Sequence, residues 1–166
     1  MLQETVDKTV THHPEIPLAA ESGEVHAQDC VLRSSLQYGA GAFTWGKVSL
    51  VDCECSKSRH SATMCTGEGT KLDVKGGRFY RSQRHVVVAG DGAQVSLSGL
   101  TMAKSTDCEV FATESGTHIS VDKCTLEQNG GDGGTACCEA VLDVKRTRSV
   151  NNKTGLCIRD DVNQRI

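Results

Sequence analysis

The sequence repeats a short apolar pattern at an almost constant interval, and this period limits the possible folds more than any other feature. In each copy an apolar residue is followed by another two places on, and small or apolar residues then occupy the sixth and eighth positions. The copies begin at Val25, Val48, Leu72, Val95, Ile119 and, more weakly, Leu142. Successive starts are separated by 23, 24, 23, 24 and 23 residues. Copies this evenly spaced predict a solenoid, in which each coil packs only against its neighbours.

Within one copy the pattern predicts two short strands joined by a bend. In the fourth copy Val95 and Leu97 fall on one face and Ser96 on the other, as in a β-strand. The two-residue gap that follows breaks the alternation, so the chain must turn there. The second residue of the gap is Asp29, Asp52, Gly76, Gly99, Lys123 and Arg146 in the six copies. Asp and Gly tolerate left-handed backbone angles, whereas the two basic residues depart from this rule.

A third apolar stretch follows 13–17 residues after each start and completes the coil. It is seen as Ala40-x-Ala42, Ala62-x-Met64, Val86–Val88, Cys108-x-Val110 and Leu156-x-Ile158. In the fifth copy it slips to Ala136-x-Cys138, and we interpret Gln128–Gly134 as an insertion. Three short strands in each period predict an all-β solenoid of about six triangular coils.

Two other repeat architectures fit the sequence poorly. Left-handed hexapeptide helices repeat at roughly 18 residues, which is too short. Leucine-rich repeats allow about 20–29 residues but require a leucine three residues before the first strand position. At that place this chain has Ser22, Trp45, Gly69, Gly92, Gly116 and Glu139. We therefore favour a parallel β-helix.

Two segments carry a resemblance to a known family. ISVDKCTLEQNGGDGG from Ile119 and VSLSGLTMAKS from Val95 resemble the parallel β-helix repeats of the pectin-lyase-like superfamily. The resemblance covers residues 23 to about 158 and implies a right-handed parallel β-helix. That superfamily includes polysaccharide lyases and hydrolases, phage tail proteins and non-catalytic interaction domains. The resemblance therefore specifies a fold and leaves the activity open.

We expect three parts in the chain: an N-terminal arm or cap (1–22), a β-helix repeat domain (23–159) and a C-terminal tail (160–166). The arm is polar apart from Ile16–Leu18, and we expect it to cover the first coil or to reach a partner. No apolar stretch approaches the ~20 residues that a bilayer crossing needs, and the N-terminus holds no apolar signal core. We expect no membrane span. We also expect an intracellular protein, in the cytoplasm or, after loss of a presequence, in an organelle lumen.

Charge and cysteine content exclude further classes. Lysine and arginine total 18 against 21 acidic residues, giving a net charge of −3, and no long run of like charge suggests nucleic-acid binding. The nine cysteines are an odd number without an export signal, which indicates reduced, buried thiols. Cys53-x-Cys55 and Cys137-Cys138 lack zinc-finger spacing, and His12-His13 is interpreted as a solvated pair. We expect neither a metal nor a cofactor.

Catalytic groups on this fold would occupy outward or corner positions of adjacent coils. Asp73 and Asp143 lie three coils apart, roughly 14 Å, which is too far for a hydrolytic carboxylate pair. Glu54 beside Arg78 predicts a surface ion pair. Asp29 and Asp52 share one corner of neighbouring coils, so their carboxylates are expected about 5 Å apart. They are the alternative catalytic pair, although selection for the corner backbone angle explains both more simply.

These observations favour a protein without catalytic activity. The chain has no Ser-His-Asp arrangement, phosphate loop or dinucleotide fingerprint, and it has no long projecting loops that could form a substrate cleft. We predict a scaffold or interaction subunit that binds protein partners within a larger assembly. The alternative is a carbohydrate-binding or polysaccharide-cleaving protein, either a lyase or a hydrolase.

Overall fold

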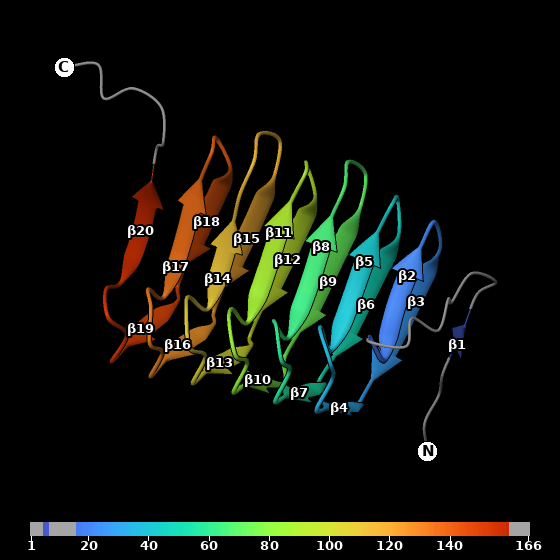
Figure 1. Cartoon of the computed structure of the whole chain (residues 1–166), viewed down its shortest axis with the longest axis horizontal. Coiled ribbons are helices and arrows are strands. Elements are labelled where there is room, and N and C mark those ends of the chain that lie inside the picture. The colour runs from blue at the N-terminus through green and yellow to red at the C-terminus, as the bar shows by residue number, and fades with distance from the viewer. Residues whose placement is uncertain (1–4, 7–15, 160–166) are drawn as a thin grey trace.

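Three β-sheets run along a solenoid, one on each side of its cross-section (Figure 1). The computed structural model describes residues 5–6 and 16–159, with side chains for residues 16–155. The first sheet contains β1 (Thr5–Val6), β3 (Glu24–Gln28), β6 (Lys47–Val51), β9 (Lys71–Lys75), β12 (Gln94–Ser98), β15 (His118–Asp122) and β18 (Val141–Lys145). The second contains β4 (Val31–Arg33), β7 (Glu54–Ser56), β10 (Arg78–Tyr80), β13 (Thr101–Ala103), β16 (Thr125–Glu127) and β19 (Arg148–Val150). The third contains β2 (Leu18–Glu21), β5 (Ala40–Phe43), β8 (Thr63–Thr66), β11 (Val87–Gly90), β14 (Val110–Ala112), β17 (Gly134–Cys137) and β20 (Leu156–Arg159).

Parallel pairing joins each coil to the next in the register that the repeat predicts. Val95 of β12 lies between Leu72 of β9 and Ile119 of β15, so residues at the same repeat position form a column along the solenoid. The predicted parallel solenoid of about six coils, with its period of 23–24 residues, is confirmed.

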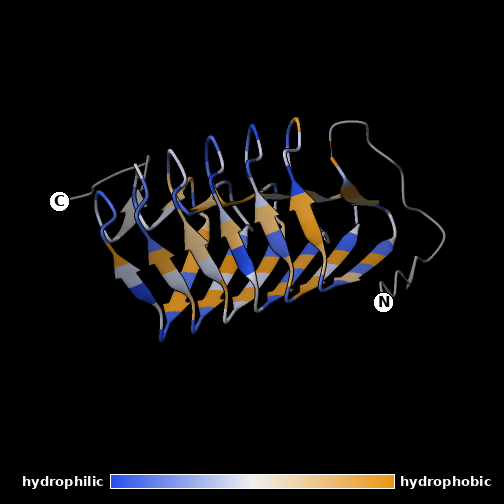
Figure 2. Ribbon diagram, turned by 90° about the horizontal axis from the view of Figure 1, so that it is seen from below, coloured by the Kyte–Doolittle hydropathy of each residue, from blue (hydrophilic) through white to orange (hydrophobic). Residues whose placement is uncertain are grey.

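The columns predicted to point inward form the core. At the eighth repeat position, Cys55, Phe79, Met102 and Leu126 are fully buried in four consecutive coils. Figure 2 shows hydrophobic and hydrophilic residues alternating along the strands, as expected when one face packs inside. In the sixth coil Leu142 and Val144 are only half-buried and Val141 is 49% exposed. The core is therefore densest in the middle coils.

Each coil turns three times. We name the turns the first corner (between the first and second sheets), the second corner (between the second and third sheets) and the third corner (leading to the next coil). At the first corner the left-handed angle is present in all six coils. It is found at Asp29, Asp52, Gly76, Gly99, Lys123 and Arg146, with φ of 53°, 50°, 66°, 64°, 53° and 48°. The two basic residues adopt the corner conformation despite their side chains.

The segment Gln128–Gly134 is not an insertion, so that interpretation was wrong. Val110 of β14 pairs with Gly134 of β17, and the loop 128–133 has the same length as the loops 34–39, 57–62, 81–86 and 104–109. The glycines occupy an ordinary second corner where the stacked backbones approach closely. A Cβ on Gly130 would lie 2.2 Å from the Thr106 carbonyl oxygen.

Part of the segment assigned to the N-terminal arm belongs to the coil stack. β2 pairs in parallel with β5, so the solenoid begins before residue 23, the predicted boundary. β1 pairs antiparallel with β3 of the first coil. His12-His13 and the tail 160–166 lie outside the described residues. Among the described residues, no helix is long and apolar enough to cross a bilayer.

Candidate functional site

Asp29 and Asp52, the alternative catalytic pair, occupy the same corner of neighbouring coils. The backbone N–H of Asp29 donates to the Val51 carbonyl at 3.0 Å, which stacks the two corners. Both side chains are exposed, and Asp52 leans toward the next coil, where a Cβ on Gly76 would lie 2.1 Å from Asp52 Oδ1. The positive φ at both residues gives a backbone reason for their presence. A catalytic role for the pair stays a prediction.

The ion pair expected between Glu54 and Arg78 forms with a different partner. Glu54 Oε1 accepts hydrogen bonds from Arg33 Nη2 at 2.9 Å and from the Tyr80 hydroxyl at 3.0 Å. These two hydrogen bonds, from Tyr80 and Arg33, hold the pKa of Glu54 below its ordinary value. Arg78 instead lies over the Tyr80 ring, with its Cζ 4.9 Å from the ring centroid. Its guanidinium therefore has no carboxylate partner among the described residues.

Half of the eight cysteines with described side chains are buried inside the solenoid. Cys53, Cys55, Cys65 and Cys124 are buried, and Cys30, Cys108, Cys137 and Cys138 are half-buried. Burial raises the pKa of Cys55 to about 12. Within residues 16–155, no three His, Cys, Asp or Glu side chains are placed to hold a metal ion. The four buried cysteines pack in the hydrophobic core.

A fully buried carboxyl, that of Glu109, lies inside the second corner, and sequence reasoning did not identify it. Glu109 is fully buried, its Oε1 accepts a hydrogen bond from the Glu127 N–H at 2.7 Å, and its Oε2 has no hydrogen-bond partner. Burial raises the pKa of Glu109 to about 8. The carboxyl is therefore mostly neutral at pH 7. Because Glu109 is closed off from solvent, it cannot touch a large substrate.

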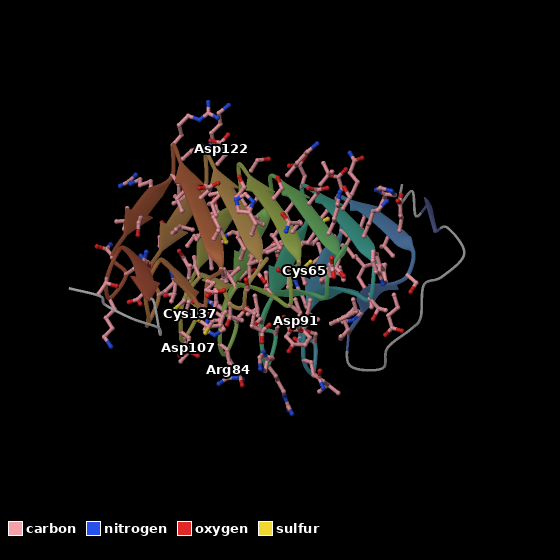
Figure 3. The ribbon with its side chains drawn as sticks, turned by 90° about the horizontal axis from the view of Figure 1, so that it is seen from above. Cys65, Arg84, Asp91, Asp107, Asp122 and Cys137 are labelled. Atoms are coloured by element: carbon pink, nitrogen blue, oxygen red, sulfur yellow. The ribbon has the colours of Figure 1, made fainter. Side chains whose placement is uncertain are left out.

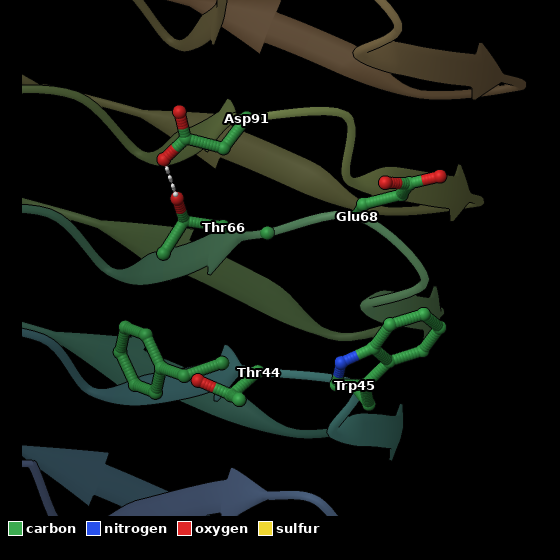
Figure 4. Close-up of a pocket in the computed structure, with 7 residues that line it drawn as sticks. Thr44, Trp45, Thr66, Glu68 and Asp91 are labelled. Atoms are coloured by element: carbon green, nitrogen blue, oxygen red, sulfur yellow. Dashed lines mark hydrogen bonds between the residues drawn. The ribbon is translucent and has the colours of Figure 1, made fainter.

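The strongest candidate site is a groove at the third corner (Figure 4). It has a volume of about 350 Å³, and its lining residues are Phe43, Thr44, Trp45, Thr66, Gly67, Glu68 and Asp91. Trp45 is 64% exposed. It is also the sole tryptophan of the chain. Trp45 has φ of 69°, an unusual angle for a bulky residue. Left-handed angles recur at the third corner in successive coils, so the exposure of the aromatic ring is the feature that points to a binding position.

The next coil holds the Trp45 ring in place. A Cβ on Gly69 would lie 2.5 Å from Trp45 Cε3, so the indole packs directly against the Gly69 backbone. The Trp45 backbone N–H donates to Thr70 Oγ1 at 3.2 Å, which fixes the chain that carries the ring. These contacts fix the ring on the solenoid while much of its surface stays open to solvent.

Carboxylates extend the groove along the third corner. A second hollow of about 420 Å³ shares Glu68 and Asp91 with the first and continues to Ser115 and Gly116. Asp91 Oδ2 accepts a hydrogen bond from the Thr66 hydroxyl at 2.8 Å, and this bond holds the pKa of Asp91 below its ordinary value. Glu114 Oε2 accepts from the Asp91 N–H at 2.7 Å. We call Trp45, Thr66, Glu68, Asp91 and Glu114, with the two hollows, the corner groove.

The sequence carried only a weak signal for the corner groove. Trp45 was noticed because it occupies a place where a leucine-rich repeat would have leucine. The acidic residues Glu68, Asp91 and Glu114 are spaced about one coil apart, but they lie at the third corner, outside the strand positions and the first corner where catalytic groups were expected. An alignment of the third-corner residues of successive coils places these three acidic residues in one column.

Comparison with known proteins supports one family assignment. Residues 17–164 match the family model described as a right handed beta helix region, which covers nearly the whole chain. No curated protein and no solved structure matches significantly. The match agrees with the predicted resemblance to the pectin-lyase-like superfamily and confirms the right-handed fold. It assigns no activity.

Proposed function

The chain belongs to the right-handed β-helix family, and from this premise we propose that it is a non-catalytic interaction module that binds protein partners. The observation that carries the proposal is the exposed Trp45 ring, held over Gly69 at one end of the corner groove. Tryptophan is among the residues most enriched at interface hot spots. A rigid solenoid presents such a residue without a large ordering cost.

The charge of the corner groove favours a basic segment of the partner. Glu68, Asp91 and Glu114 lie on consecutive coils beyond Trp45, about one coil spacing apart. Lysine or arginine side chains of an extended segment would meet these carboxylates, and one of them would lie over the indole face. The open shape of the groove suits an extended chain better than an enclosed small molecule.

A carbohydrate ligand is the second candidate. The Trp45 ring lies beside the hydroxyls of Thr44 and Thr66 and the carboxylate of Asp91. An aromatic face with nearby hydroxyls and carboxylates can stack on a sugar ring and hydrogen-bond to its hydroxyls. Cleavage would in addition need the Asp29 and Asp52 pair.

The test is binding of a fluorescein-labelled octa-arginine peptide, followed by anisotropy. We expect Trp45→Ala to weaken binding at least tenfold and Trp45→Phe to weaken it less. The double variant Glu68→Gln/Asp91→Asn should also weaken binding. Its matched control is Asp29→Asn/Asp52→Asn, which removes the same charge from the first corner and should bind as the unaltered chain does.

The same variants decide between the candidates. Saturable binding of a neutral oligosaccharide that depends on Trp45, without peptide binding, would favour the carbohydrate role. Cleavage of a polysaccharide that Asp29→Asn/Asp52→Asn abolishes would contradict the proposal of a non-catalytic module.

A further inference from the structure

The second corner and the adjoining second sheet carry a concentrated positive charge. Seven exposed basic side chains lie there over the first four coils: Arg33, Lys57, Arg59, Arg78, Arg81, Arg84 and Lys104. We call these residues the basic face. The acidic residues of this region with exposed or half-buried side chains are Glu54 and Asp107, since Glu109 is fully buried and mostly neutral. Seven positive and two negative charges give a local charge of +5 in a chain of net charge −3.

Stacking of the coils brings like charges together. The Lys57 N–H donates to the Tyr80 carbonyl at 3.3 Å, and the Arg81 N–H donates to the Ala103 carbonyl at 3.0 Å. These bonds place Lys57, Arg81 and Lys104 in one column, with φ of 59°, 58° and 59°. Neighbouring members are about 4.8 Å apart at the backbone. Left-handed angles at non-glycine residues and mutual repulsion both oppose this arrangement.

Most of these cations have no carboxylate partner. Arg33 pairs with Glu54, and Arg84 Nε lies 3.9 Å from Asp107 Oδ2. Figure 3 shows Arg84 and Asp107 projecting from neighbouring coils on the same side of the solenoid. Among the described residues, no carboxylate oxygen lies within 4.0 Å of the side-chain nitrogens of the remaining five cations. The face is therefore charged and available.

The Tyr80 ring lies against two of the cations of the basic face. Arg78 and Arg81 have their Cζ atoms 4.9 Å and 5.9 Å from the centroid of the Tyr80 ring. The Tyr80 hydroxyl is bound to Glu54. Guanidinium groups thus lie against the Tyr80 ring, and Glu54 holds its hydroxyl, so the ring is engaged by its neighbours. The ring orients two planar groups that can each grip a carboxylate with two hydrogen bonds.

We propose that the basic face is a second docking surface, which binds a carboxylate-rich segment of a partner protein. The cationic column covers three coils, about 10 Å along the axis, which suits a short segment. A longer polyanion would extend over the acidic residue Glu127 in the next coil. Side-chain carboxylates match the forked guanidinium groups of Arg78, Arg81 and Arg84. This surface is separate from the corner groove, so the two proposals can fail independently.

The test compares a fluorescein-labelled octa-glutamate peptide with a labelled dT8 oligonucleotide, both followed by anisotropy. Arg81→Gln/Lys104→Gln should weaken peptide binding at least tenfold. The matched control, Lys123→Gln/Lys145→Gln, removes the same charge from exposed positions elsewhere and should weaken it less than twofold. Arg81→Lys/Arg84→Lys keeps the charge and should still weaken binding severalfold, because the forked geometry is lost.

Three results would overturn the proposal. Equal weakening by the two glutamine pairs would mean that only net charge matters. Tighter binding of dT8 than of the peptide would assign the face to nucleic acid. A concentration-dependent dimer that Arg81→Gln/Lys104→Gln abolishes would assign it to a second copy of this chain.

Discussion

The second and third corners are built from the same stacked backbone, yet they carry opposite charge. The second corner presents the cationic column of Lys57, Arg81 and Lys104, whereas the third presents Glu68 and Asp91 beside Trp45. Both corners use left-handed backbone angles in successive coils. The interior hydrogen bonds fix the path of the chain at each corner. The outward residue is then free to vary, so a uniform solenoid can carry two different surfaces.

The interiors of the two corners also differ. Inside the second corner Asn129 Oδ1 accepts from the Ser105 N–H at 2.7 Å, and Asn129 Nδ2 donates to Asn152 Oδ1 at 2.8 Å. Inside the third corner, single threonine hydroxyls accept backbone hydrogen bonds. Thr70 accepts from the backbone N–H of Trp45, and Thr117 accepts from the backbone N–H of Gly92. A connected network holds the longer corner, and isolated hydroxyls hold the shorter one.

The largest effect should come from breaking the network of the second corner. Asn129→Ala leaves the buried Ser105 N–H without an acceptor, so we expect a loss of about 2–4 kcal/mol in the free energy of unfolding. Thr70→Val at the third corner keeps the volume and removes one hydrogen bond, so we expect a loss of about 1 kcal/mol. Urea titration of both variants measures the difference. Equal losses would show that the second corner gains nothing from its connected network.

An effect of similar size should come from pH. The pKa of Glu109 is raised to about 8 in the folded chain, against 4.5 for a free side chain. The folded state therefore binds the proton more tightly, and stability falls as the pH rises from about 4.5 to about 8. Glu109→Gln should remove this loss. Between pH 5 and pH 8, its free energy of unfolding should rise relative to that of the unaltered chain by roughly 2 kcal/mol or more.

Asp91 at the third corner should behave in the opposite sense. Its pKa is lowered below 3.8, mainly by the hydrogen bond from Thr66. The contribution of Asp91 to the free energy of unfolding is therefore present above pH 4 and is lost as the pH falls through the lowered pKa. Thermal unfolding of Glu109→Gln and Asp91→Asn across pH 3–9 compares the two. A Glu109→Gln profile parallel to that of the unaltered chain would refute the buried-carboxyl account.

The smallest effect concerns the cationic column. Lys104 has φ of 59°, and asparagine tolerates this angle better than lysine. Lys104→Asn should also relieve repulsion from Arg81, so we expect a gain of roughly 0.5 kcal/mol in stability. The same variant should bind the octa-glutamate peptide more weakly. Reduced stability together with unchanged peptide binding would contradict a column kept for docking.

The fold was predictable because it is a property of the period. The spacing of Val25, Val48 and the later starts identified the coils, and alternation identified the buried columns. The glycine-rich segment 128–134 was wrongly predicted to be an insertion because its composition suggested extra loop length. The pairing of β14 with β17 shows that this loop is no longer than the loop 104–109. Register is set by the coil before and the coil after, which a single segment does not reveal.

The surfaces were harder to predict because they arise only from stacking. Lys57, Arg81 and Lys104 are 24 and 23 residues apart, so no charged run exists in the sequence. The raised pKa of Glu109 depends on burial in a corner that the sequence marks as a loop. Trp45 could have been singled out as the sole tryptophan, but its exposure follows from its place against Gly69.

The emission of Trp45 tests the central claim most directly, because the only tryptophan of the chain lies in the corner groove. The chain is titrated separately with octa-arginine and octa-glutamate peptides, and binding is followed by both tryptophan emission and peptide anisotropy. The account predicts that octa-arginine shifts the emission saturably, while octa-glutamate binds without shifting it. An unchanged emission with bound octa-arginine, or an equal shift with both peptides, would contradict two separate docking surfaces.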